Sequence, residues 1–229
     1  PGAKYIVPED DYCLWIFDLA NRYFPNNTLI LNDTVQASFT EFCGKYSGYY
    51  LNIKDLLNRG ARIDEIGMQC HLGDNGPQKV YNSEMLYDVL DTYATLGKPI
   101  NVSEVSIPSK FGGERLYKVC FSHPSVTGIT WWNMPDDGVL TTKRVAFDEN
   151  LPSTGLIDGD YNEKAAYKTL NKLINTEWTT ELTVPAVDGL AAFRGFFGVY
   201  DITIHFGNKT VKETVKLKKG AKQFKKLFI

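Results

Sequence analysis

Histidine, methionine and cysteine are scarce in this 229-residue chain, which has three histidines, three methionines and four cysteines. The cysteines lie far apart and inside apolar segments, without the paired spacing that a zinc site needs; they are Cys13, Cys43, Cys70 and Cys120. We therefore expect buried thiols rather than metal ligands. No predicted strand is followed by a glycine-rich loop, which argues against a dinucleotide or ATP site. The sequence predicts no metal and no cofactor.

An excess of charge of either sign is missing as well, since the formal net charge is −2. This balance gives no electrostatic reason to expect nucleic acid or a membrane surface as a partner. No apolar run is long enough to cross a bilayer, and no cationic-then-apolar leader is present. The chain begins at Pro1 without a methionine, so we expect a segment to precede it.

The sequence does have a regular alternation of apolar runs with amphipathic segments. Apolar runs of strand length occupy residues 28–33, 63–71, 100–107 and 128–133. Helices are predicted near residues 10–24, 40–58, 83–96, 114–122 and 163–174, with Asp10 or Asp11 and Ser83 as caps. The run at 28–33 has the pattern of a strand buried on both faces. Strands that alternate with helices demand a parallel sheet.

Polar residues stand at the C-terminal end of each apolar run. They are Asn32 and Asp33, Gln69 and His71, Glu104, and Trp132 with Asn133. The carboxyl ends of the strands form the active-site edge of a parallel barrel, whereas a doubly wound sheet would use mainly its crossover crevice. The pattern therefore favours a (β/α) barrel.

The character of the chain changes after residue 175. Short strands are predicted at residues 179–187, 190–194, 199–206, 211–217 and 223–228, with turns at 188–189, 207–208 and 219–220. Eight lysines between residues 209 and 226 alternate with apolar residues, which is typical of the solvated face of an edge hairpin. We predict a small module of four or five strands, packed on the preceding helices.

Glu104 lies in the middle of an otherwise apolar run, where an unpaired carboxylate is costly. On its own it has two interpretations, a solvated strand end without a role or a paired site residue. His71 alone is more typical of a structural histidine. Alternation along a strand points one of Trp131 and Trp132 inward and the other outward, and we expect Trp132 to face the site.

Several ordered motifs together resemble glycoside hydrolase family 10, the endo-β-1,4-xylanases that fold as a (β/α)8 barrel. The motifs lie at residues 66–72 (IGMQCHL), 100–107 (INVSEVSI) and 128–133 (GITWWN), with agreeing pieces at 29–33, 122–126, 155–158 and 161–170. The resemblance spans about residues 10–175. It implies the C-terminal half of the barrel, about strands five to eight, over residues 1–175, with a small β-sheet module over 176–229.

The resemblance also implies roles for individual residues. Glu104 matches the family's catalytic nucleophile, and His71 matches the histidine that hydrogen-bonds it. The residues expected to bind substrate are Gln69, Asn32, Trp131, Trp132 and Asp136, with Trp132 as the platform under a sugar ring. The implied ligand is xylan or xylo-oligosaccharide, and the implied location is extracellular or at the cell surface.

The chain departs from the family at two kinds of position. Ser106 stands where the family usually has an aspartate that supports the histidine, so we expect His71 to be less well fixed. Thr34 and Val35 replace the aromatic and amide residues that often follow the fifth strand, so the binding subsites are expected to be thinner.

The second carboxylate of a retaining mechanism is also missing from the pattern. Retaining hydrolysis needs a second carboxyl group roughly 5 Å from the nucleophile, and the family carries it on a strand that would precede Pro1. The candidates Glu9, Glu65, Asp74 and Asp136 do not match its place. We therefore predict weak or no hydrolysis by this chain alone, with a non-catalytic xylan-binding protein or pseudoenzyme as the alternative. Unpaired sheet edges predict association with the missing N-terminal half or self-association as a dimer.

Overall fold

The computed structural model describes residues 11–34, 43–71, 82–107, 110–136 and 154–218. The chain forms two compact units, residues 1–170 and 171–229, each described here by itself. The module boundary at residue 175 remains a prediction. Glu9, Asp10, Val35, Asp74 and the predicted strand at 223–228 lie outside the described residues.

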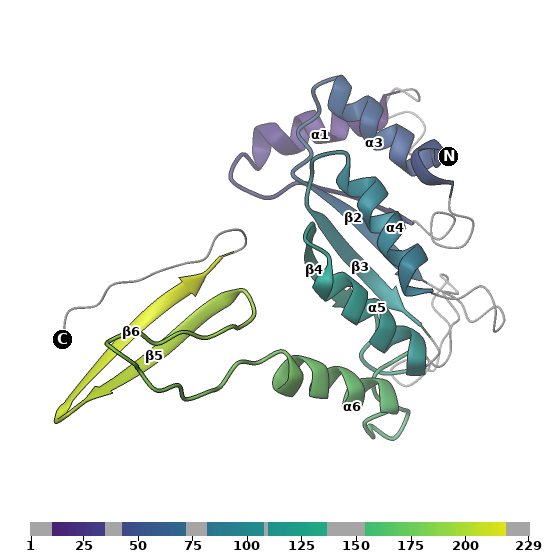
Figure 1. Cartoon of the computed structure of the whole chain (residues 1–229). Helices are drawn as coiled ribbons and strands as arrows, with labels where there is room; N and C mark the ends of the chain where they lie inside the picture. The colour runs from purple at the N-terminus through teal and green to yellow at the C-terminus, as the bar shows by residue number, and fades with distance from the viewer. Residues whose placement is uncertain (1–10, 35–42, 72–81, 108–109, 137–153, 219–229) are drawn as a thin grey trace. The chain divides into compact units, whose positions relative to one another are not determined.

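A parallel sheet of four strands forms the centre of the first unit. Its strands are β1 (Ile30–Thr34), β2 (Glu65–His71), β3 (Ile100–Ser106) and β4 (Val126–Trp131), paired in chain order. They alternate along the chain with the helices α1 (Tyr12–Tyr23), α3 (Gly48–Asn58), α4 (Ser83–Ala94) and α5 (Lys110–Ser122). This arrangement, visible in Figure 1, is half of a (β/α)8 barrel and confirms the predicted fold class.

The apolar core of this unit lies between the sheet and its helices. Alternate side chains of β2 and β3 are completely buried, namely Ile66, Met68, Cys70, Ile100, Val102 and Val105. Figure 1 shows α4 and α5 lying along one face of the sheet, and α4 adds the buried Leu86, Val89 and Leu90 to the core. The residues between these, such as Gln69, Asn101 and Ser103, are only half-buried. They belong to the opposite face, which a closed barrel would enclose.

β1 is more exposed than its sequence predicts. Leu29 is buried, but Ile30 is 39% exposed and the three residues at the end of the strand are exposed as well. β1 pairs with β2 alone and is therefore one edge of the four-stranded sheet. The prediction of a strand buried on both faces is wrong for β1, because burial depends on neighbours that an apolar run does not reveal.

Helix starts differ from the predictions because a cap is a specific side-chain contact. Ser47 caps α3, so this helix starts after residue 47 rather than at 40 and follows a short 3₁₀ turn. Asn82, not Ser83, caps α4 through its side-chain oxygen. Asp11 precedes α1, yet its carboxylate pairs with Arg59 at 2.6 Å instead of capping the helix. Among the described helices, none has the length and apolar content needed to span a membrane.

The four cysteines differ in burial. Cys70 and Cys120 are buried, Cys13 is half-buried and Cys43 is exposed. The prediction of a buried thiol is therefore wrong for Cys43. Burial raises the pKa of the Cys120 thiol to about 12 and that of Cys70 well above its ordinary value, so both stay protonated and inert at neutral pH.

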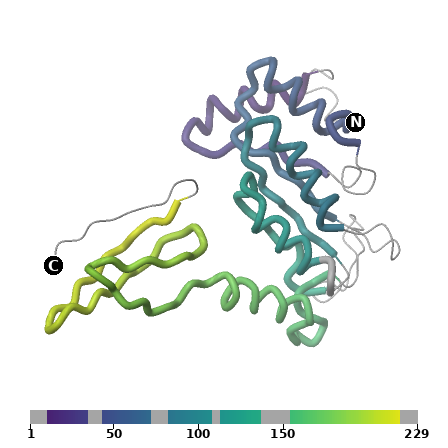
Figure 2. Tube along the Cα trace, in the orientation of Figure 1, coloured from purple at the N-terminus to yellow at the C-terminus, as the bar shows by residue number. Residues whose placement is uncertain are grey.

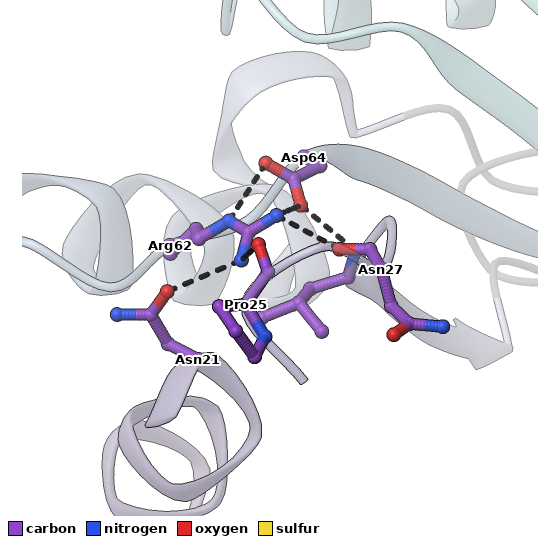
Figure 3. A network of polar contacts seen from close by, with 6 residues as sticks. Asn21, Pro25, Asn27, Arg62 and Asp64 are labelled. Atoms are coloured by element: carbon purple, nitrogen blue, oxygen red, sulfur yellow. Dashed lines mark hydrogen bonds and ion pairs between the residues drawn. The ribbon is translucent and has the colours of Figure 1, made fainter. Parts of the chain in front are cut away.

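Arg62 ties the segment between α1 and β1 to the start of β2 (Figure 3). Its guanidinium donates to the side chain of Asn21 at 3.2 Å and to the backbone carbonyls of Pro25 at 2.9 Å and Asn27 at 2.8 Å. It also pairs with Asp64 at 2.9 Å. The backbone N–H of Leu29, and then the Arg62 guanidinium, hold the pKa of Asp64 below its ordinary value. This network fixes where β1 enters the sheet.

The described part of the second unit, residues 171–218, contains an antiparallel hairpin. Its strands β5 (Gly198–Phe206) and β6 (Lys209–Leu217) pair along their whole length, and Gly207 turns the chain with a φ of +55°. The turn and both strands match the predictions, and Lys209, Lys212 and Lys216 are exposed as expected. Figure 2 traces this hairpin and the long segment that leads into it from α6 (Ala165–Lys172).

The strands predicted at residues 179–187 and 190–194 do not form. A single bridge joins Val187 to Leu190 around the predicted turn, and the rest of this described segment has no ladder. Tyr200 of β5 contacts this segment instead, with its hydroxyl 3.3 Å from the Thr180 hydroxyl and its ring centroid 5.3 Å from that of Phe193. A Cβ on Gly195 would lie 2.3 Å from the Tyr200 hydroxyl, so a side chain there would require Tyr200 to move.

Candidate functional site

Glu104 is held at the carboxyl edge of the sheet by side chains from two other strands. Asn32, on β1, donates its Nδ2–H to Glu104 Oε1 at 3.0 Å. His71, the last residue of β2, lies with Nε2 3.0 Å from Glu104 Oε2. The side chains of His71 and Glu104 are 22% and 20% exposed, so the pair is partly shielded from water yet reachable. Each carboxylate oxygen therefore has a nitrogen partner.

A bulge in β3 aims Glu104 at these partners. Gln69 pairs with Ser103 and His71 with Ser106, so three steps along β3 oppose two along β2. The extra residue gives Glu104 a φ of +56°, a backbone conformation that is uncommon outside glycine. Without a bulge, successive side chains alternate between the two faces of a sheet. Here Ser103 and Glu104 are consecutive residues, yet both contact Asn32. Bulges frequently re-aim side chains next to active sites.

Ser103 and Gly67 fix the orientation of the Asn32 amide. The Ser103 hydroxyl donates to Asn32 Oδ1 at 2.6 Å, which leaves the amide N–H₂ to face Glu104. Gly67 is the register partner of Asn32, and a Cβ at Gly67 would lie 2.5 Å from Asn32 Oδ1 and 2.9 Å from its Cα. The absence of a side chain at Gly67 therefore makes the room that Asn32 occupies.

Tyr49 supports the same strand pair from the helix layer. Its hydroxyl lies 2.7 Å from the Leu31 carbonyl and 2.7 Å from the Gly67 carbonyl, the residues beside and opposite Asn32. Burial, and then the negative charge of Asp33, raise the pKa of Tyr49 well above its ordinary value, so the hydroxyl remains a donor. The helix layer is thus connected to the backbone that carries Asn32.

His71 has a partner on its second nitrogen as well. Its Nδ1 lies 2.9 Å from the Ser106 hydroxyl, and Ser106 is only 2% exposed. The Trp132 ring meets the imidazole edge to face, with centroids 5.6 Å apart. A serine hydroxyl and an indole therefore contact His71 where the family usually has a charged partner. That His71 is less well fixed than with an aspartate remains a prediction.

The structure brings together Asn32, His71, Glu104 and Trp132, of which Trp132 is 43% exposed. Trp131 points elsewhere. Its indole N–H donates to the Thr154 carbonyl at 2.8 Å and its ring packs beside Gly113. Gln69, on β2, is half-buried two residues before His71, and among the described residues it makes no hydrogen bond to Glu104.

Asp136 is engaged within the loop after β4. Its carboxylate pairs with Lys164 at 2.5 Å and accepts the Gly155 N–H at 2.9 Å. Glu65, at the start of β2, accepts a long hydrogen bond of 3.5 Å from Asn101, away from the cluster. Within the described part of the chain, Glu104 is the single carboxylate of this cluster, and no group of acidic, histidine or cysteine side chains there could hold a metal ion.

Sequence reasoning overlooked Ser103, Gly67 and Tyr49. Gly67 and Ser103 have the strand parity of Gln69 and Asn101, so the alternation of buried and polar positions places them on the site face. No pattern in the sequence indicates Tyr49, because its role depends on how a helix packs across two strands.

Fold and site together define a β/α-barrel protein whose site is organised around one carboxylate at the carboxyl ends of its strands. Comparison with protein families gives the particular family. The model described as "Glycosyl hydrolase family 10" matches residues 5–173, and the chain belongs to that family.

Similar proteins include anti-sigma-I factor RsgI6 of Acetivibrio thermocellus, which is 30% identical over 175 residues, 72% of this chain and 21% of that protein. Endo-1,4-beta-xylanase B of Thermotoga neapolitana is 26% identical over 186 residues, 76% of this chain and 49% of that enzyme. Native xylanase 10B from Thermotoga maritima superposes with a TM-score of 0.57 at 23% identity, over 73% of this chain and 52% of that one. The chain therefore spans about half, or less, of the length of these relatives.

Proposed function

We propose that this chain is the C-terminal half of a retaining glycoside hydrolase that cleaves β-1,4-xylan, with Glu104 as its nucleophile. The observation that carries the proposal is the placement of the Glu104 carboxylate between two nitrogen partners, one of which, His71, packs against the exposed indole of Trp132. Nitrogen donors favour the ionised carboxylate that a nucleophile needs. The C–H face of a pyranose stacks on an aromatic ring such as that of Trp132.

In this reaction Glu104 Oε attacks the anomeric carbon. The new carbon–oxygen bond forms as the glycosidic bond breaks, and the leaving oxygen takes a proton from a general acid. Water then attacks the anomeric carbon, gives one proton to the conjugate base of that general acid, and releases Glu104 as a carboxylate. The proton donor lies roughly 5 Å from the nucleophile in such sites, and among the described residues no second carboxylate is hydrogen-bonded to Glu104, Asn32 or His71. The chain alone should therefore hydrolyse xylan poorly or not at all.

A substrate that needs no general acid tests Glu104 directly. We expect a dinitrophenyl β-xylobioside, whose phenolate leaves unprotonated, to release one equivalent of phenolate per chain and to leave a xylobiosyl adduct on the peptide containing Glu104. Mass spectrometry detects the adduct. Glu104→Gln should abolish labelling, while Glu84→Gln, an exposed carboxylate on α4, should label like the wild type. Labelling of the Glu104→Gln variant at wild-type level would rule out the assignment.

The remaining predicted contacts belong to the same proposal. Asn32 and Gln69 would bind sugar hydroxyls, and Trp132 would form the platform. Trp131 and Asp136 would act at the border of the site, since both already have contacts within the chain. Supporting this choice of ligand, xylanase 10B from Thermotoga petrophila is a solved relative in complex with xylobiose, with a TM-score of 0.58.

A second candidate is a carbohydrate-binding protein without turnover. It is favoured by the isolation of Glu104 among the described carboxylates and by Ser106 in the histidine support. Titration calorimetry with xylohexaose separates the candidates: binding without labelling by the aryl xyloside supports this one. Trp132→Ala should weaken binding about tenfold, equal to about 1.4 kcal/mol, while Trp15→Ala on α1 serves as the matched control and should bind normally.

We further propose that other β/α units complete the sheet beyond β1 and β4, from a preceding segment or a second copy. The exposed Ile30 and the free edges of both outer strands support this. We place the reaction outside the cell or at its surface, because xylan is a polymer. A relative from Thermoanaerobacterium saccharolyticum is described as an intracellular xylanase, so immunodetection in culture medium against cell lysate is the deciding measurement.

A further inference from the structure

His71 connects two residues of β3 through its two ring nitrogens. Nε2 lies 3.0 Å from Glu104 Oε2, and Nδ1 lies 2.9 Å from Ser106 Oγ. A neutral imidazole carries one proton, which is on one nitrogen or the other. The partners on the two sides decide which nitrogen holds it.

The hydrogen bond to the Glu104 carboxylate requires a proton on Nε2. An ionised carboxylate has no proton and only accepts hydrogen bonds. A contact of 3.0 Å is therefore a hydrogen bond when Nε2 is the donor. The Asn32 amide already donates to the other carboxylate oxygen, so both oxygens are acceptors.

The buried Ser106 hydroxyl disfavours a second proton on Nδ1. A hydroxyl either donates to Nδ1 or accepts from it. Ser106 is 2% exposed, and among the described residues its hydroxyl bonds to His71 alone. If Nδ1 carried a proton, the Ser106 hydroxyl would accept it and its own proton would be buried without a partner, which costs about 1–3 kcal/mol.

We propose that Ser106 is a positioning residue that keeps His71 in the neutral form with its proton on Nε2. A carboxylate at position 106 would have the opposite effect, because it only accepts and would require a proton on Nδ1 as well. Among the described residues, Glu104 is the single charged group that contacts the ring, and Trp132 meets it with its ring system. His71 thus supports Glu104 as a neutral donor, a role that rests on the proposed function of Glu104.

Nitrogen NMR of the unliganded chain tests this directly, since it distinguishes protonated from unprotonated ring nitrogens. The chain has three histidines, and a His71→Gln variant assigns the His71 signals. At neutral pH we expect Nε2 protonated and Nδ1 unprotonated. Ser106→Ala should turn this single form into a mixture, Ser106→Thr should restore it, and Ser106→Asp should protonate both nitrogens.

Ser122→Ala is the control, because the Ser122 hydroxyl donates to the Val119 carbonyl within α5 and lies outside the hydrogen-bonded cluster of Glu104. It should leave the His71 signals unchanged. A proton on Nδ1 in the native chain, or an unchanged spectrum in both Ser106→Ala and Ser106→Asp, would overturn the proposal; if the alanine variant does not fold, the aspartate variant decides. The spectra need no substrate, so their outcome is independent of the labelling of Glu104.

Discussion

A carboxylate near the end of a buried strand is stable when its oxygens have hydrogen-bond donors, and each oxygen of Glu104 has a nitrogen partner. The donors come from β1 and β2, so three strands must be in register before the carboxylate is satisfied. Ser103 and Ser106 each fix one of these partners. The site is therefore a chain of five polar side chains, and each has its orientation set by the next.

At the residue scale, Gly67→Ala should disturb this series of hydrogen-bonded side chains most directly. The new methyl group would lie 2.5 Å from Asn32 Oδ1 and 2.9 Å from its Cα, so β1 must shift. We expect a loss of about 1–3 kcal/mol in the free energy of unfolding, measured by urea denaturation. Gly48→Ala is the control, because Gly48 has open space around it at the start of α3. Equal stability of the two variants would contradict the role given to Gly67.

At the element scale, the strands were the most predictable part of the chain. Apolar runs with polar C-terminal ends predicted β2, β3 and β4 within a few residues. β2 and β3 contain buried residues, whereas the residues of β4 are half-buried or exposed. The exposure of β1 and the absence of strands at residues 179–187 and 190–194 could not be predicted from the local pattern. Both depend on pairing partners that lie elsewhere in the sequence. The hairpin β5–β6 was predictable because its turn and its alternation are both local.

The site was predictable in its members but not in its geometry. Glu104, His71, Asn32 and Trp132 follow from motif positions. The bulge that aims Glu104 has no residue signature, since Glu104 takes a positive φ without being glycine. The sequence shows Ser106 as a departure from the family. Only the 2.9 Å contact shows that its hydroxyl bonds to His71 Nδ1 in place of the usual aspartate.

Tyr49 shows how a helix takes part in the site without touching Glu104. Tyr49→Phe keeps the ring and removes the hydroxyl that lies between the Leu31 and Gly67 carbonyls. Leaving these carbonyls without that donor should lower the free energy of unfolding by about 1–3 kcal/mol, measured by thermal or urea denaturation. Tyr46→Phe, at a residue that is 87% exposed, should change stability by less than about 0.5 kcal/mol. If both variants match the wild type, Tyr49 does not support the strands.

Two buried acidic groups of α5, the Cys120 thiol and the Tyr117 hydroxyl, predict a loss of stability at high pH. Burial raises the pKa of Cys120 from 9.0 to about 12 and that of Tyr117 from 10.0 to about 12. Between these values the unfolded chain has lost protons that the folded chain keeps, so the free energy of unfolding falls as pH rises from about 9 toward 12. Below pH 9 these two groups should contribute no pH dependence.

Urea denaturation across this pH range measures the effect. Cys120→Ala should flatten the decline, because it removes one of the buried acids. Cys43→Ala is the control, since this thiol is exposed and should leave the slope as it is. A stability that stays constant up to pH 11 in the wild type would show that these groups are not buried as described.

At the scale of the whole molecule, β1 and β4 each pair with one strand among the described residues, and α1 has an apolar stripe that is exposed. Tyr12, Ile16 and Tyr23 of α1 are 54%, 45% and 70% exposed, and Ile30 on β1 is 39% exposed. Free edges of a parallel sheet are templates for pairing. We therefore expect the isolated chain to associate.

Light scattering after gel filtration should give a mass of at least twice 25.8 kDa. The double variant Ile16→Lys, Ile30→Lys should shift the chain toward the monomer, because it places charge on both exposed surfaces. Leu51→Lys, on α3, is the control for a charge added elsewhere and should keep the wild-type mass. A stable wild-type monomer would argue that these edges are closed by the chain itself.

The bulge in β3 decides which face of the sheet the Glu104 side chain points to. If β3 continued without the bulge after the pairing of Ser103 with Gln69, Glu104 would stand opposite the buried Cys70 and its side chain would turn to the helix side of the sheet.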